Sequence, residues 1–164
     1  MRAALRGWYT AADIETLAAR KATLAGELKL GDLARLSDYL CTTRGWDDRR
    51  RAGTGVVRAE LTFGLGQLGV LALKLGYEAK LSVVCQRCLE PCELDISNQV
   101  EFAVMTSEAL AAELMEGDEP IILENDDRLC PAQLIEDELI VSIPLAPKHT
   151  RLDQCAFVPV SSNV

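Results

Sequence analysis

The middle of the chain alternates apolar and polar residues with a period of two. Three runs show this alternation, over residues 57–63, 71–83 and 94–104. Since residues two apart point to the same side of a strand, each run predicts a long strand with one buried face and one solvent-exposed face. A glycine-rich turn separates the first two runs, and residues 85–88 separate the last two. The pattern predicts an antiparallel meander of three long strands, in which Gly76 marks a bulge.

The segments that flank the meander carry helical spacing or short apolar runs. They predict, in chain order, a helix over 11–21 capped by Thr10, a strand over 22–28, a helix over 31–40 capped by Asp32, a short helix after Ser107, a strand over 121–123, and a helix from Pro131 that Pro144 ends. Together these elements predict one α+β domain over residues 1–164. Its antiparallel sheet has about three to five strands with helices packed on one face, and residues 145–164 form an irregular tail. The predicted core is Leu61, Phe63, Leu73, Leu81, Val83, Ile96, Phe102, Leu134, Leu139 and Ile143.

Composition narrows the class of protein. Apolar residues make up 49% of the 164 residues and aromatic residues only 5%, so we expect a globular core of Leu, Val, Ile and Ala. No apolar run is long enough for a membrane span, and the first residues lack a secretory pattern. We therefore expect a cytoplasmic protein whose 6 cysteines are reduced or metal-bound rather than paired in disulfides.

Charge is distributed unevenly along the chain. Residues 1–60 hold 11 basic and 8 acidic side chains, whereas residues 61–164 hold 6 basic and 17 acidic ones. The net charge of −8 argues against a surface built mainly to hold nucleic-acid phosphates. The stretch 89–138 contains 15 acidic residues and a single basic residue, Arg128. This stretch predicts attraction to a basic protein such as a ribosomal protein, the alternative being a surface kept acidic for solubility.

Cys85 and Cys88 form a CxxC pair between two predicted strands. The two-residue gap lets both thiolates reach one metal ion from a single turn, as in zinc knuckles. A tetrahedral site needs two more ligands, and Cys92, His149 and Cys155 are the candidates.

Two other interpretations of the pair remain open. A redox pair is expected in a strand-to-helix turn of a parallel unit, whereas Cys85 and Cys88 lie between antiparallel strands. The two thiols could also pack as small, inert hydrophobic groups. Cys41 and Cys130 have no partner at metal spacing, so we expect them to be structural or surface thiols.

The motifs of serine hydrolases, P-loop proteins, zinc proteases and dinucleotide-binding folds are missing from the sequence. The consecutive residues 136–138 point around their helix, which predicts a solvated face rather than paired acid–base catalysts. Arg49, Arg50 and Arg51 form a basic run that could contact RNA phosphates, the alternative being a solvated loop. These features predict a protein that is not an enzyme and has no small-molecule substrate.

Two motifs resemble those of the YceD family, the large ribosomal RNA subunit accumulation proteins. The first is the cysteine motif VCQRCL at 84–89. The second is an acidic helix at 134–140 followed by IPLAPKH at 143–149 and then Cys155, which is similar to the family's LPLxPxH run and trailing cysteine. The resemblance spans about residues 24–155. The chain departs from the family pattern at Cys92, where an aromatic residue is common.

The resemblance implies a bacterial, cytoplasmic, non-enzymatic factor that supports accumulation of large-subunit ribosomal RNA. We hypothesise that it binds a ribosomal protein or a large-subunit precursor particle, with a further contact to ribosomal RNA through the arginine run. Arg87 is expected to project from the knuckle as an exposed contact, and Glu136 and Asp137 to contribute to the acidic partner-binding face.

Zinc is the cofactor that the cysteine spacing indicates. The predicted ligand set is Cys85, Cys88, His149 and Cys155, with Cys92 as an alternative ligand. Two other functions remain as alternatives: a thiol-redox enzyme that uses Cys85 and Cys88, and a structural interaction protein without a metal.

Overall fold

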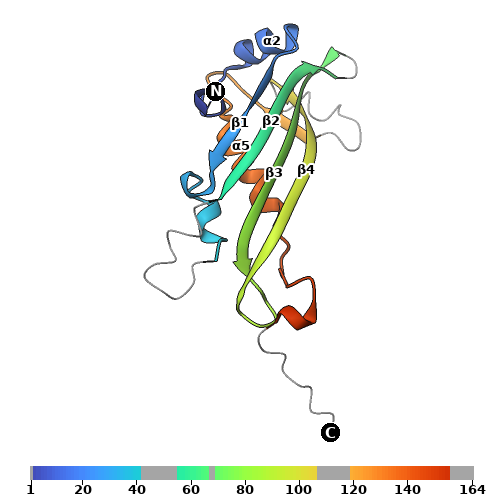
Figure 1. Cartoon of the computed structure of the whole chain (residues 1–164). Helices are drawn as coiled ribbons and strands as arrows, with labels where there is room; N and C mark the ends of the chain where they lie inside the picture. Colours follow the sequence, from blue (N-terminus) through green and yellow to red (C-terminus); the bar gives the residue numbers. More distant parts are fainter. Residues whose placement is uncertain (1, 42–54, 67–68, 107–118, 156–164) are drawn as a thin grey trace.

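The computed structural model describes residues 2–41, 55–66, 69–106 and 119–155. Its centre is one five-stranded sheet whose strands lie in sequence order across the sheet (Figure 1). The strands are β1 (Thr23–Lys29), β2 (Val56–Leu65), β3 (Leu71–Val84), β4 (Pro91–Met105) and β5 (Glu119–Ile122). The predicted meander of three long strands is therefore confirmed in β2, β3 and β4.

The prediction of a wholly antiparallel sheet is wrong at β5. Strands β1 to β4 pair antiparallel, whereas β5 pairs parallel to β4. A parallel neighbour needs a crossover connection of about a dozen residues or more, and residues 106–118 separate these two strands. The short run at 121–123 carries too little alternation to reveal its direction. The fold class is α+β with a mixed sheet.

Gly76 does not form the predicted bulge. It pairs with Glu60 on β2 and with Gln99 on β4, and the register continues without interruption on both sides. The alternation therefore holds through the whole of β3. Odd-numbered residues of this strand face the core, and even-numbered ones face the opposite side of the sheet.

Three α-helices are described: α1 (Arg2–Leu5), α2 (Ala11–Ala19) and α5 (Pro131–Ser142). Thr10 caps α2 as predicted, because its hydroxyl accepts from the Asp13 N–H while the Asp13 carboxylate accepts from the Thr10 N–H. Among the described residues, none of the helices combines the length and the apolar character needed to cross a membrane. The predicted helix after Ser107 falls outside the described residues.

The helix predicted over 31–40 is instead two short 3-10 helices, η1 (Leu30–Asp32) and η2 (Leu36–Asp38). Asp32 does not cap a helix but pairs with Arg6, at 2.7 Å between Nη2 and Oδ2. The Leu36 N–H would make the first bond of a helix capped at Asp32. It donates to Glu136 Oε1 at 3.1 Å, so a contact from a distant residue replaces the helical bond.

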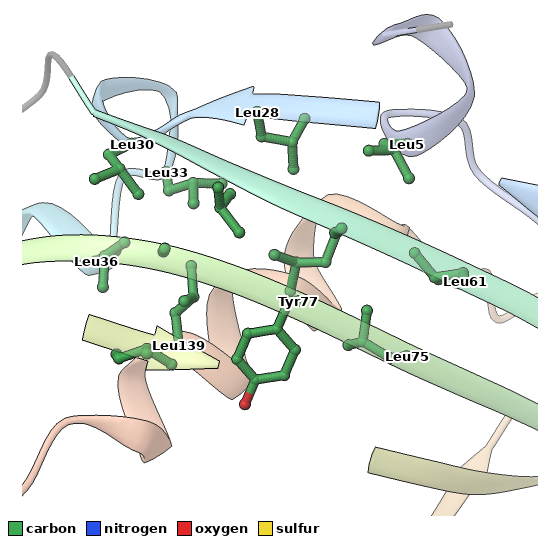
Figure 2. Close-up of a cluster of buried hydrophobic side chains, with 14 of the residues drawn as sticks. Leu5, Leu28, Leu30, Leu33, Leu36, Leu61, Leu75, Tyr77 and Leu139 are labelled. Carbon is green, nitrogen blue, oxygen red and sulfur yellow. The ribbon is translucent and has the colours of Figure 1, made fainter. Parts of the chain in front are cut away.

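The core lies between the sheet and α5, where aliphatic side chains surround Tyr77 and Leu139 (Figure 2). The hydroxyl of Tyr77 reaches the end of α5, with 2.8 Å between its oxygen and Ser142 Oγ. Eight of the ten predicted core residues are buried. The other two, Leu134 and Ile143, are partly buried and pack against that core.

Glu136 is the buried charged side chain of the described core, with an exposed fraction of 6%. Its Oε1 accepts from the backbone N–H groups of Arg35 and Leu36, and its Oε2 pairs with the Arg35 guanidinium at 3.2 Å. The prediction that residues 136–138 form a solvated face is therefore wrong for Glu136. The carboxylate instead fastens α5 to η2, because it neutralises a guanidinium and satisfies two backbone donors.

Replacement of this carboxylate tests its role. We expect Glu136→Ala to lower the free energy of unfolding by about 1–3 kcal/mol, because two backbone donors and a guanidinium lose their acceptor. The matched variant Asp137→Ala removes an exposed carboxylate that also contacts Arg35. It should cost less than about 1 kcal/mol. Urea unfolding of both variants measures the difference, and equal losses would show that burial of Glu136 is unimportant.

Candidate metal centre

The CxxC pair lies in the tight turn that joins β3 to β4. The Cys85 N–H donates to the Glu90 carbonyl at 2.9 Å, and the Leu89 N–H donates to the Cys85 carbonyl at 2.8 Å. Leu89 adopts a left-handed conformation with φ of 61°, which closes the turn. Cys85 is fully buried and Cys88 is half-buried, so both sulfurs are partly or wholly withdrawn from solvent.

The segment after α5 returns to this turn. Figure 1 shows the 3-10 helix η4 (Leu152–Gln154), coloured red, beside the loop between β3 and β4. The Gln86 N–H donates to the Pro147 carbonyl at 2.8 Å, which fastens the segment to the turn. Residues separated by about sixty positions in the chain therefore meet at one end of the sheet.

Four side chains converge where the turn and the returning segment meet. The ligand atoms of Cys85, Cys88, His149 and Cys155 all lie within 4.8 Å of one another. His149 Nδ1 is 3.5 Å from Cys88 Sγ and 3.6 Å from Cys155 Sγ. Three thiols and one imidazole at these distances could hold a metal ion, and this set contains the four ligands predicted from the sequence.

His149 is oriented by its second ring nitrogen. Nε2 lies 3.1 Å from the Pro91 carbonyl oxygen, which can only accept a hydrogen bond. Nε2 must therefore carry the proton in the neutral ring, which leaves the lone pair of Nδ1 directed at the cysteine sulfurs. A backbone carbonyl behind a histidine ligand is a common means of fixing the tautomer for metal binding.

The electrostatics of the cluster favour a cation. Burial raises the pKa of Cys85, but backbone N–H groups of His149, Cys88 and Arg87 donate to its sulfur and together lower the pKa to about 5. Burial raises the pKa of Cys155, and the neighbouring Cys88 and Cys85 sulfurs raise it further. A thiolate therefore forms more readily at Cys85 than at Cys155, and a cation bound beside these sulfurs would favour the thiolate form.

Cys92, the alternative ligand, does not belong to this set of four. It is buried at the start of β4, where it pairs with Val83. Burial raises the pKa of Cys92, and the nearby Cys85 and Cys88 sulfurs raise it further. A neutral thiol beneath the cluster fits these surroundings better than a metal-bound thiolate.

Arg87 does not project freely from the turn as predicted. It is half-buried, and its Nη1 lies 3.8 Å from Cys155 Sγ. Its positive charge therefore faces the sulfur cluster. The role of Arg87 in partner binding stays a prediction, since no partner is described.

The other predicted site residues lie away from the cluster. Glu136 and Asp137 both contact Arg35, so these acidic groups already have a partner within the fold. Their role in binding another protein stays a prediction. The arginine run at 49–51 lies outside the described residues.

Two contacts that position the cluster cannot be predicted from the sequence, because backbone carbonyl groups make them. They are the Pro91 carbonyl behind His149 and the Pro147 carbonyl that holds Gln86. Backbone acceptors have no residue signature. The prolines of the IPLAPKH run were the only indication that this segment has a fixed path.

A mixed sheet whose one end carries three cysteines and one histidine defines the class: a small α+β protein with a candidate metal site, built from a turn and the segment after α5. The family model described as "Large ribosomal RNA subunit accumulation protein YceD" matches residues 73–163. The chain belongs to the YceD family. The match begins within β3, so it does not extend over residues 24–72, which the resemblance included. A search of solved structures found no match.

The low pKa of Cys85 can be tested on metal-free protein. Thiolates absorb at the long-wavelength end of the far ultraviolet, where thiols absorb little. An acid titration followed by this absorbance should therefore show the loss of one thiolate with a midpoint near pH 5. Cys85→Ser should abolish this step, whereas Cys130→Ser, at the start of α5, should retain it. Absence of thiolate below pH 8 in the parent protein would contradict the proposed hydrogen bonds to this sulfur.

Proposed function

We propose that this protein is a non-enzymatic ribosome-biogenesis factor that acts by binding a ribosomal protein or a large-subunit precursor particle in the cytoplasm. Membership of a family named for large-subunit ribosomal RNA accumulation supports a role in ribosome biogenesis. The observation that carries the proposal is the convergence of the two family motifs, the cysteine turn and the IPLAPKH run, in one four-residue cluster. A structural metal bound at this cluster would hold the two motifs together and stabilise a binding surface.

Zinc is the metal that this donor set fits best. Tetrahedral zinc bound to sulfur at about 2.3 Å and to nitrogen at about 2.0 Å places its ligands roughly 3.5–3.8 Å apart. The described separations from His149 Nδ1, 3.5 and 3.6 Å, fall in this range. Four protein ligands leave no open position for substrate, which is the arrangement of a structural site. The zinc would hold the C-terminal segment against the β3–β4 turn.

A thiol-redox function is the second candidate, and the lowered pKa of Cys85 is the observation that favours it. Catalytic thiols must also be accessible to a substrate disulfide. Cys85 is fully buried in the turn, and two further metal-type ligands surround the pair. The arrangement therefore supports a structural metal more strongly than redox catalysis.

Metal content is the direct measurement. We expect about one zinc per chain in protein purified without chelator, and less than about a tenth of that in Cys88→Ser, because three ligands hold structural zinc poorly. Cys92→Ser is the matched control, since it changes a buried neighbouring thiol outside the set of four and should retain the zinc. Loss of zinc in Cys92→Ser with retention in Cys88→Ser would overturn the ligand assignment.

Binding is tested by recovery of partners from bacterial lysate at low and high salt. We expect tagged protein to retain large-subunit ribosomal proteins or precursor particles at low salt and to lose much of them at high salt, because charge contributes to the encounter. Cys88→Ser should recover less than the parent protein. Recovery of no ribosomal protein by the zinc-loaded parent would refute the proposal.

A further inference from the structure

The face of the sheet opposite the core contains a shallow trough of about 870 Å³ that crosses strands β1 to β4. Its floor follows a row of directly paired residues, in which Glu60 lies between Ala25 and Gly76, and Gln99 follows on β4. Ala25 and Gly76 carry almost no side chain. The trough therefore exists because small residues occupy two of the four positions in this row.

Gly76 keeps the trough open. A Cβ atom added at Gly76 would meet no atom within 4 Å, and the residue needs no left-handed conformation. A glycine inside a strand reduces its stability and often marks a close approach of another molecule. Because neither a bulge nor a packing contact explains this glycine, space above the sheet is the property that it provides.

The neighbouring row of paired residues forms one wall of the trough, and its negative charge is partly neutralised within the fold. Arg58 lies between Glu27 and Glu78, at 2.9 Å and 3.2 Å from their carboxylate oxygens. Ser97 completes this row on β4. One cation thus serves two carboxylates, and the row keeps a net negative charge.

On the other side, Lys74 pairs with Glu101 at 3.2 Å. Glu60, in the floor, forms no ion pair within the described part of the chain, and its carboxylate is exposed. The trough therefore offers one unpaired carboxylate beside an open space, flanked by cations that are each engaged by other acids. Such a site attracts a positive charge and disfavours a phosphate.

We propose that this trough binds an extended, lysine- or arginine-rich polypeptide segment, with one cationic side chain placed over Gly76 and paired with Glu60. This inference deepens the proposed function and rests on it, because it names the surface and the partner chemistry by which the factor would hold a basic protein. The side-chain amide of Gln99, which also lines the trough, supplies a donor and an acceptor for the segment's backbone.

A short fluorescent peptide of alternating Lys and Ser is the probe, and the same layout with Glu is its control. We expect the Lys peptide to bind the zinc-loaded full chain at about 50 mM salt and to weaken as salt rises. Amide NMR shifts should centre on Glu60, Gly76 and Gln99. Shifts centred on another acidic region would overturn the assignment, as would displacement of the peptide by a single-stranded oligouridylate.

Two pairs of variants make the test specific. Gly76→Thr fills the trough and should weaken peptide binding by about tenfold, whereas Gly64→Thr changes another open glycine on the same face and should have no effect. Glu60→Gln should weaken binding by about threefold to fivefold, as expected for an exposed ion pair. Glu93→Gln removes an equal charge outside the trough and should alter binding by less than about twofold.

The melting temperature of each variant shows whether the fold is intact, and Gly76→Thr should melt no lower than the parent protein. Parent-like peptide binding by both Gly76→Thr and Glu60→Gln would refute the trough. This outcome differs from failure of the proposed function, which is the absence of ribosomal proteins from the parent protein's lysate recovery. Peptide binding without that recovery would support a basic ligand from another source.

Discussion

The candidate metal centre depends on backbone hydrogen bonds that fasten the C-terminal segment to the β3–β4 turn. The Pro147 carbonyl accepts from the Gln86 N–H, and the Pro91 carbonyl lies at His149 Nε2. These contacts fix where His149 lies and which of its nitrogens faces the sulfurs. These contacts hold His149 beside the cysteines without a bound ion, so less ordering would be needed if a cation binds there.

The sheet could be predicted from sequence because alternation is a local property. Val57, Leu61 and Phe63 are all buried, as the period of two requires. Two of the errors in the predicted fold arise from distant contacts. The direction of β5 depends on its pairing with β4, and the break in the helix near Leu36 depends on Glu136, which lies 100 residues further along the chain. Neither contact leaves a pattern in its own segment.

The candidate metal centre likewise combines residues that the sequence predicts with features that only the folded chain determines. Cysteine spacing identified Cys85 and Cys88, the need for two more ligands made Cys92, His149 and Cys155 candidates, and the family resemblance also included His149 and Cys155. Spacing alone could not separate Cys92 from the other candidate ligands, because its sequence interval is suitable and only the folded structure shows which sulfurs gather around His149. Arg87 was misplaced for a related reason: a charged residue in a turn is usually solvated, but here Cys155 comes within reach of its guanidinium.

Anchoring of α5 at its middle and at its last turn has a consequence for the segment that follows it. Glu136 fixes the helix to η2, and Ser142 fixes its last turn to Tyr77. Only six residues then separate Ser142 from His149. This short tether keeps the histidine at high effective concentration near the cysteine turn without any bound ion. If a metal ion binds the cluster, its exchange would require movement of this short segment rather than refolding of the domain.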